Sequence, residues 1–283
     1  MIKYTIILCS LLLLASCQKN EDDISFTNTS SITNGVKTYR HSEDGKPTSL
    51  DPIRAATQYS SLVVSNVFDT LYTYKYLTRP YQLKPNLAQD LPQVSENGLT
   101  YIIKIKPGVY FHKHPAFGLP QAEDKGREVV AEDFIYSLKR TFDPKNRALG
   151  AWLWQGKIKG LDEWKDNGAD YDQPVSGLTA LDEQTIQIQL IKPYPQLTYT
   201  FAQAFAAITP REVVEALGQE FGSKPIGSGP FILDRFDTEV AYFDKNPDFR
   251  KEPLDIYAEG YDASIHAETG IKELHGKTPP FIA

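Results

Sequence analysis

Residues 97–111 read NGLTYIIKIKPGVYF, and this stretch predicts the first element of a sheet. From Tyr101 to Ile105 a strongly apolar side chain occupies every second position, which is the spacing of a half-buried strand. Pro107-Gly108 then predicts a turn, so residues 109–111 are expected to return as the partner strand. The stretch therefore predicts a β-hairpin.

Helix and strand patterns alternate along the rest of the chain. Residues 61–72 and 131–141 have the apolar spacing of helices, and residues 185–190 alternate as a strand. A capping box at Thr209-Pro210-Arg211-Glu212 predicts a helix that ends at Gly218. GSGP at 227–230 predicts a turn that leads into a strand at 231–233. Together these patterns predict a mixed α/β fold.

Composition excludes several classes of function. The 283 residues carry a formal net charge of −6 without a basic stripe, which argues against nucleic-acid binding. Cysteines occur only at Cys9 and Cys17, so the folded body has no disulfide, cysteine metal site or thiol nucleophile. The 16 Tyr, 14 Phe and 3 Trp either pack in the core or line a ligand cleft.

The N-terminus has the form of a secretory signal, expected over residues 1–16. Lys3 precedes a short apolar run at 6–15, which is too short to span a membrane. LASC at 14–17 resembles the lipobox of bacterial lipoproteins, which implies cleavage before Cys17 and lipid attachment to its sulfur; the alternative is an ordinary signal peptide. Residues 17–36 are polar and are expected to form the lipid anchor and a flexible tether.

A search for catalytic or metal chemistry finds no set that matches a known pattern. His112 and His114 could lie on one face of a strand, but no acidic residue or cysteine at matching spacing completes a metal site. Two surface histidines are the alternative. The Gly-Ser-Gly at 227–229 lacks the spacing of a nucleophile elbow. We therefore expect no catalytic residues, no metal and no cofactor.

Six motifs occur in the order found in one protein family. They are SLDP (49–52), PNLAQD (85–90), NGLTY with KPGVYF (97–111), AEDFIYS (131–137), PIGSGPF (225–231) and NPDF (246–249). The chain resembles the family 5 extracellular solute-binding proteins, the oligopeptide-, dipeptide- and nickel-binding subunits of ABC importers. It departs from the family pattern at Val130, where a threonine cap is missing, and at 112–127, where a longer loop is expected.

The resemblance implies a periplasmic binding protein-like α/β fold of class II, in which two lobes close around the ligand. Because family members are longer, it implies that most of the first lobe is present and the second lobe is absent. Residues 37–68 with 180–283 would form the core of the first lobe, and 69–179 a small accessory subdomain. We expect such a truncated chain to bind peptide poorly or not at all.

The resemblance also implies function. The protein would bind peptides on the periplasmic side of a bacterial membrane, lipid-anchored and monomeric, and deliver them to the permease and ATPase subunits of an importer. It would not be an enzyme. Lys46, Pro47 and Thr48 would form a strand at the cleft. Trp152 and Trp154 would share a face if extended, with at least one at the cleft; packing against the small subdomain is the alternative.

Three other functions remain open on the sequence alone. A lipid-anchored sensor without a transport role could use the same fold. A nickel- or haem-binding protein would have only His112 and His114 as local support. A periplasmic hydrolase would need a nucleophile and a base that no motif supplies.

Overall fold

The computed structural model describes residues 29–33, 36–120, 125–237 and 240–279. The chain divides into two compact units, Met1–Asp44 with Ile282–Ala283, and Gly45–Phe281. In the first unit, β1 (Thr29–Thr33) and β2 (Val36–Arg40) pair antiparallel. Strand β1 lies at the end of the expected tether over 17–36, where β-branched residues favour a strand; the tether itself remains a prediction. The signal sequence and Cys17 lie outside the described residues.

The central feature of the second unit is a four-stranded antiparallel sheet of order β5-β6-β8-β7. Buried side chains of β6 lie opposite buried side chains of β8, with Tyr101 across from Ile188 and Ile103 across from Ile186. This pairing confirms the two strands predicted from alternation. The strands are β5 (Gln93–Val94), β6 (Thr100–Lys104), β7 (Leu178–Ala180) and β8 (Thr185–Gln189).

The predicted hairpin partner of β6 is wrong. Residues 109–111 do not pair with β6, since β5 and β8 already occupy both of its edges. Gly108, with φ +72°, turns the chain away instead. Phe111 N–H donates to the Arg127 carbonyl, and Val129 N–H donates to the Val109 carbonyl. The segment therefore pairs with residues 127–129.

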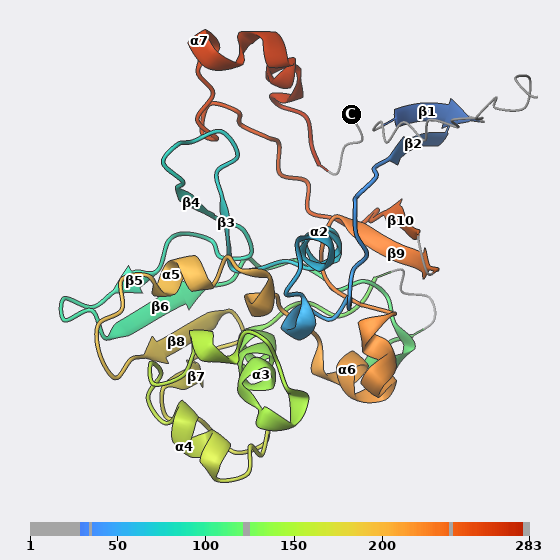
Figure 1. The fold of residues 1–283 in the computed structure, drawn as a ribbon. Coiled ribbons are helices and arrows are strands. Elements are labelled where there is room, and N and C mark those ends of the chain that lie inside the picture. Colours follow the sequence, from blue (N-terminus) through green and yellow to red (C-terminus); the bar gives the residue numbers. More distant parts are fainter. Residues whose placement is uncertain (1–28, 34–35, 121–124, 238–239, 280–283) are drawn as a thin grey trace, which may run out of the picture. The chain divides into compact units, whose positions relative to one another are not determined.

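Helix α3 (Ala131–Phe142) runs beside the sheet and confirms the helix predicted at 131–141 (Figure 1). Its apolar side chains, with Phe134 and Leu138 among them, enter the larger of two hydrophobic clusters. Val130 supplies no side-chain cap, as the sequence indicated, but the Asp133 carboxylate accepts the Val130 N–H at 2.9 Å. One half of a capping box therefore starts this helix.

A second hydrophobic cluster lies around α2 (Gln58–Val67) and α6 (Arg211–Leu217). The ribbon of β9 (Phe231–Phe236) and β10 (Ala241–Lys245) packs on it through Leu233 and Phe243. The preceding turn explains the glycines of the PIGSGPF motif. Gly229 donates its N–H to the Val67 carbonyl, and a Cβ there would lie 2.6 Å from the Val67 carbonyl carbon. Only glycine allows this approach to the end of α2.

One predicted helix boundary and one predicted helix cap are wrong. Helix α2 ends at Val67 rather than at residue 72, because Phe68 is already extended and the chain enters strand β3 at Tyr72. Helix α6 begins at Arg211 without the predicted capping box. Thr209 is buried, and its N–H donates to the Ser137 hydroxyl on α3, so contacts between helices replace the local cap. Gly218 ends the helix as predicted.

The expected subdomain boundary at 179/180 falls inside strand β7, which pairs with β8. The sheet therefore joins residues on both sides of it. The buried residues of the larger hydrophobic cluster extend from Leu71 to Ile208, and those of the smaller one lie before and after that range except for Ala207. The division into residues 37–68 with 180–283 and residues 69–179 remains a prediction.

Short elements complete the unit. Strands β3 (Tyr72–Tyr74) and β4 (Leu83–Pro85) form a ribbon. The Glu259 carboxylate forms an ion pair with Lys84 on this ribbon. The remaining elements are η1 (Pro52–Arg54), η2 (Pro115–Phe117), η3 (Pro144–Asn146), η4 (Ala151–Leu153), α4 (Leu161–Asp166), α5 (Leu197–Thr200), η5 (Ala204–Ala206), η6 (Gly218–Gly222), α7 (Ala263–His266), η7 (Ala267–Thr269) and η8 (Ile271–Leu274).

Candidate ligand-binding face

The SLDP motif is held by a buried ion pair. Both oxygens of the Asp51 carboxylate accept from the Arg140 guanidinium, at 2.7 and 2.6 Å, and both residues are buried. Burial by itself lowers the pKa of Arg140, but the hydrogen bonds and charge of Asp51 outweigh it and raise the pKa overall. Asp51 also accepts the Ile53 N–H and so starts η1. The pair fixes the SLDP turn to helix α3.

The predicted cleft segment Lys46, Pro47 and Thr48 is not part of a strand. Lys46 and Thr48 are exposed and Pro47 is half-buried. Thr48 donates its N–H to the Ser60 hydroxyl of α2 at 3.0 Å, so this N–H is already used within the protein. Pro47 has no N–H. Any backbone pairing of Pro47 or Thr48 with a ligand would therefore use their carbonyl oxygens.

The two predicted tryptophans do not share a face. Residues 151–153 form a 3-10 helix rather than an extended segment, which sends neighbouring side chains in different directions. Trp152 is 65% exposed, whereas Trp154 is 1% exposed and stacks on Phe201 with ring centroids 5.6 Å apart. Trp154 is a core residue, so only Trp152 remains a candidate ligand contact.

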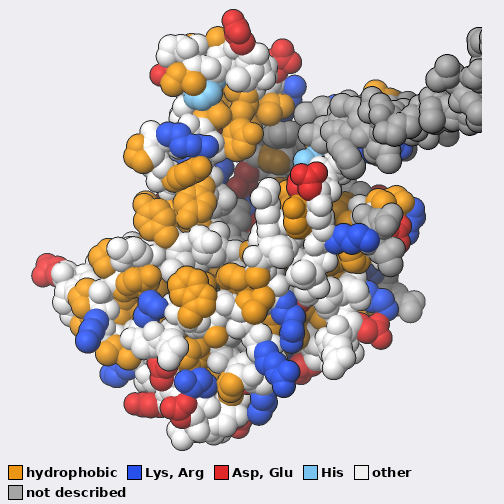
Figure 2. Space-filling view, viewed as in Figure 1, with side chains coloured by type: hydrophobic (Ala, Val, Ile, Leu, Met, Phe, Trp, Pro, Cys, Tyr) orange, Lys and Arg blue, Asp and Glu red, His pale blue; other side chains and the backbone are white. Residues whose placement is uncertain are grey.

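A group of tyrosines at the surface, which the sequence search did not single out, lies on the same unit; Tyr81 and Tyr199 are exposed and Tyr74 is half-buried. Tyr74 contacts both Tyr81 and Tyr199, with ring centroids 5.8 and 6.4 Å apart. Figure 2 shows hydrophobic side chains gathered over the β3–β4 ribbon and over α5. In the sequence, only the high tyrosine content pointed to this group, and composition does not indicate which tyrosines contact one another.

The segment that follows α5 connects these tyrosines with Trp152. The Gln203 amide donates to the Tyr74 hydroxyl, and Phe205 packs against Gly150, where a Cβ would lie 2.5 Å from the Phe205 ring. Leu149, 51% exposed, donates its N–H to the Ile53 carbonyl. We call this surface the aromatic face; it consists of the half-buried Tyr74 and the exposed side chains of Tyr81, Leu149, Trp152 and Tyr199.

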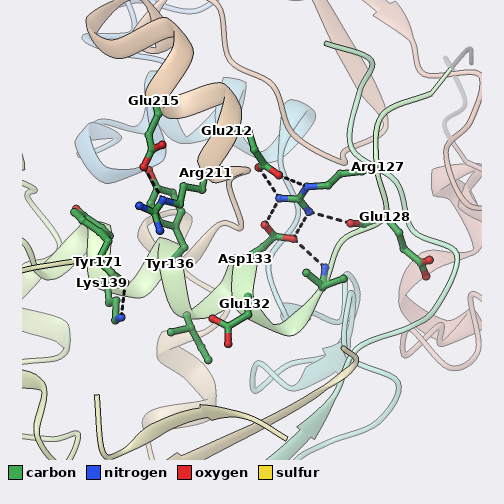
Figure 3. Close-up of a pocket in the computed structure, with 12 residues that line it drawn as sticks. Arg127, Glu128, Glu132, Asp133, Tyr136, Lys139, Tyr171, Arg211, Glu212 and Glu215 are labelled. Atoms are coloured by element: carbon green, nitrogen blue, oxygen red, sulfur yellow. Dashed lines mark hydrogen bonds and ion pairs between the residues drawn. The ribbon is translucent and has the colours of Figure 1, made fainter. Parts of the chain in front are cut away.

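A polar pocket of about 590 Å³ lies elsewhere, between α3 and α6 (Figure 3). The Arg127 guanidinium donates to the carboxylates of Asp133 and Glu212, at 2.6–2.8 Å. Arg211 similarly contacts Glu215 and Asp172. Burial raises the pKa of Asp133 even though Arg127 opposes the shift. Each arginine already has two acidic partners. We therefore interpret the ion pairs that line this pocket as a structural network that joins the two helices.

The two histidines of the conceivable metal site have separate roles. Buried His112 donates from Nε2 to the Gly229 carbonyl at 3.0 Å, and its backbone N–H donates to Gly227. His114 Nδ1 instead accepts the Ala116 N–H and starts η2. In the described ranges, no three His, Cys, Asp or Glu residues converge as a metal site would require.

His112 predicts how stability depends on pH. Burial lowers the pKa of His112, although Gly229 and Asp69, which is paired with Arg250, partly oppose the shift. The unfolded chain therefore binds more protons than the folded chain below about pH 6.5, the ordinary histidine pKa. The free energy of unfolding should fall as pH is lowered from 7.5 through 6.5, to about the folded pKa.

This dependence is measured by urea denaturation across that pH range. His112→Gln keeps a donor for Gly229 but does not titrate, so its free energy of unfolding should vary less with pH. His114→Gln is the matched comparison. Burial also lowers the pKa of His114, but this histidine is partly exposed, so His114→Gln should reduce the pH dependence less than His112→Gln does. An unchanged pH slope in His112→Gln would show that another group is responsible.

The chain matches a known protein family. Residues 82–258, well over half of the chain, match bacterial extracellular solute-binding proteins, family 5 Middle. The chain belongs to this family. Family 5 consists of solute-binding proteins rather than enzymes, and its members act outside the cytoplasm. Within the described ranges, no helix is both long enough and apolar enough to cross a membrane.

Relatives within family 5 include proteins named for peptide binding. The oligopeptide-binding protein AliA of Streptococcus pneumoniae is 30% identical over 226 residues, which cover 77% of this chain and 32% of that protein. The structure resembles the pheromone receptor PrgZ, with 25% identity, a TM-score of 0.59, and coverage of 72% of this chain and 38% of that one.

A second solved neighbour is the Escherichia coli murein tripeptide binding protein MppA, with 26% identity and a TM-score of 0.59. That match covers 72% of this chain and 37% of MppA. The likenesses confirm the predicted periplasmic binding protein-like fold. The chain spans about a third of the length of the curated relatives it matches, so it corresponds to one part of that architecture.

Proposed function

We propose that this protein is the substrate-binding component of an ABC importer and that it binds peptides outside the cytoplasm. Relatives named for oligopeptide and murein tripeptide binding support a peptide ligand. The observation that carries the proposal is the aromatic face. Leu149 and Trp152 are exposed there on a segment that Ile53 and Phe205 hold in place. Exposed apolar side chains on a rigid segment are typical of binding sites.

Each part of this surface would have its own role in holding a peptide. Trp152 would stack on a peptide side chain, because its indole offers a large rigid apolar surface. The segment Lys46, Pro47 and Thr48 would accept hydrogen bonds from peptide N–H groups through its carbonyl oxygens. Side chains of the peptide would then set specificity and its backbone would supply affinity.

The same proposal extends to the protein's surroundings. Cys17 would carry the lipid that keeps the protein, as a monomer, at the periplasmic side of a bacterial membrane. The bound peptide would pass to the permease subunits, with ATP hydrolysis in separate ATPase subunits. The protein itself would need neither a catalytic residue nor a cofactor for this role.

Tryptophan fluorescence tests peptide binding directly. Trp152 is exposed, whereas Trp154 and Trp164 are 1% and 5% exposed, so Trp152 should dominate any change in emission on binding. A synthetic library of short peptides should produce a saturable change in emission, and calorimetry should give the same affinity. Trp152→Ala should weaken binding about tenfold, equivalent to about 1.4 kcal/mol, as expected for an interfacial aromatic residue.

Trp164→Phe is the matched control, since this tryptophan is buried away from the aromatic face and should leave calorimetric affinity unchanged. Nickel and haem are titrated alongside the peptides. Saturable binding of nickel or haem without any peptide binding would overturn the proposal, and so would peptide binding that is unaffected by Trp152→Ala.

A further inference from the structure

Residues 144–161 have an unusual charge pattern. Within this stretch lie four cationic side chains, Lys145, Arg147, Lys157 and Lys159, and there is no aspartate or glutamate. The whole chain has the opposite balance, with a formal net charge of −6. The same stretch contains Leu149 and Trp152 of the aromatic face. Positive charge is therefore concentrated where the proposed ligand would lie.

The structure leaves three cations near Trp152 without acidic partners. Lys157 donates to the Trp152 carbonyl at 3.2 Å, and Arg54 donates to the Asn146 carbonyl at 3.0 Å. Arg147 is exposed between η3 and Leu149, and its guanidinium contacts no described side chain. Within the described part of the chain, none of these three cations forms an ion pair with a carboxylate.

Several arginines elsewhere in the same unit are paired with acidic side chains, whereas Arg79, within the described ranges, contacts only backbone carbonyls and the Tyr81 ring. Arg140 has Asp51, Arg250 has Asp69, and Arg127 has two carboxylates. The cations beside Trp152 differ from these paired arginines because, among the described residues, no carboxylate neutralises them. Arg54 and Arg147 in particular present guanidinium groups, which bind carboxylates through two parallel hydrogen bonds.

The backbone that presents these cations is fixed at several points. Leu149 N–H donates to the Ile53 carbonyl, one residue before Arg54. Arg54 in turn contacts the Asn146 carbonyl, one residue before Arg147. These two contacts bring η1 and the segment after η3 together. Arg54 and Arg147 are therefore on adjoining segments at the edge of the aromatic face.

We infer that the aromatic face selects peptides with acidic side chains, a conclusion that rests on the proposed peptide-binding function. Carboxylates of the ligand would pair with Arg54 and Arg147 while an apolar residue packs on Trp152. Complementary charge favours such peptides and disfavours basic ones. Because exposed ion pairs are individually weak, two of them should give a preference of about three- to tenfold rather than an absolute requirement.

An anionic membrane surface is the competing partner for cations beside an exposed tryptophan. Membrane-surface segments of this kind are typically amphipathic helices with a continuous apolar face. Residues 144–153 instead form two 3-10 turns separated by Gly150, and Phe205 packs against that glycine. The peptide partner therefore fits better, and vesicle binding becomes an outcome of the test.

The test compares three peptides of identical length with the same apolar residue, flanked by aspartate, asparagine or lysine. Affinities for the full chain are measured by calorimetry. The aspartate peptide should bind about three- to tenfold more tightly than the asparagine peptide, and the lysine peptide should bind most weakly. Raising the ionic strength should reduce these ratios. The double variant Arg54→Gln/Arg147→Gln should bring the ratio of aspartate to asparagine peptide close to one.

Arg235→Gln on strand β9 is the control, because its partner Asp234 is adjacent and it lies outside the aromatic face. It should leave all three affinities unchanged. Equal affinity for the aspartate and asparagine peptides would overturn charge selection but leave peptide binding intact. Absence of binding by every peptide would overturn both proposals. The cations would be assigned to a membrane instead if two results came together. The chain would bind phosphatidylserine vesicles and lose this binding in Arg54→Gln/Arg147→Gln, and it would show no preference among the three peptides.

Discussion

Trp154→Ala is expected to lower the free energy of unfolding by about 3–5 kcal/mol, as for other large aromatic side chains removed from a core. Trp154 is 1% exposed and stacks on Phe201, which in turn meets Phe134 edge-on with centroids 5.3 Å apart. Removing the indole would leave a cavity at the centre of the larger hydrophobic cluster. Urea denaturation followed by circular dichroism measures the change.

Trp152→Ala is the matched control, two positions away and 65% exposed. Its effect on stability should stay within about 0.5 kcal/mol, the range of ordinary surface substitutions. The two variants thus separate a structural tryptophan from a candidate ligand contact. Similar losses of stability in both would contradict the burial difference.

Arg140→Met should cost about 3–5 kcal/mol of stability, because it leaves the Asp51 carboxylate buried without its charged partner. Asp51 and Arg140 are 6% exposed each, and the guanidinium supplies both of the strong hydrogen bonds to that carboxylate. The loss should include local disorder of η1 and hence of the neighbouring aromatic face. Denaturation gives the stability, and hydrogen exchange at residues 50–55 gives the local effect.

Two further variants identify the cause. Asp51→Asn in the Arg140→Met background removes the unpaired charge but keeps an oxygen to accept the Ile53 N–H, so it should restore part of the stability. Arg211→Met removes two ion pairs of an arginine that is 39% exposed and should cost less than about 1 kcal/mol. Equal losses for Arg140→Met and Arg211→Met would show that burial of the pair is not decisive.

Local patterns predicted the elements whose burial alternates regularly. Strands β6 and β8 and helix α3 appeared at the expected places because their periodicity matches one buried face. The order of short motifs also indicated the family, which the match over 82–258 established. Lys46, Pro47 and Thr48 remain a prediction from that resemblance, since the structure holds no ligand against them.

These local patterns could not predict contacts between segments that are distant in the sequence. Glu212 was expected to complete the cap of its own helix, yet its carboxylate pairs with Arg127, which lies 85 positions earlier. The Gly-Ser-Gly turn had no assigned partner, and it meets the end of α2 and buried His112. Each of these side chains had a plausible local role that a stronger long-range contact replaced.

Composition and periodicity alone therefore determined the α/β class, helices α2, α3 and α6, strands β6, β8 and β9, and the absence of cysteine chemistry in the body of the chain. Tertiary structure decided which strand pairs with β6, which tryptophan is buried and which arginines lack acidic partners. The physical reason is that periodicity records how a segment faces its surroundings. Pairing, burial and charge neutralisation depend on the identity of those surroundings, and these come from residues far away in the chain.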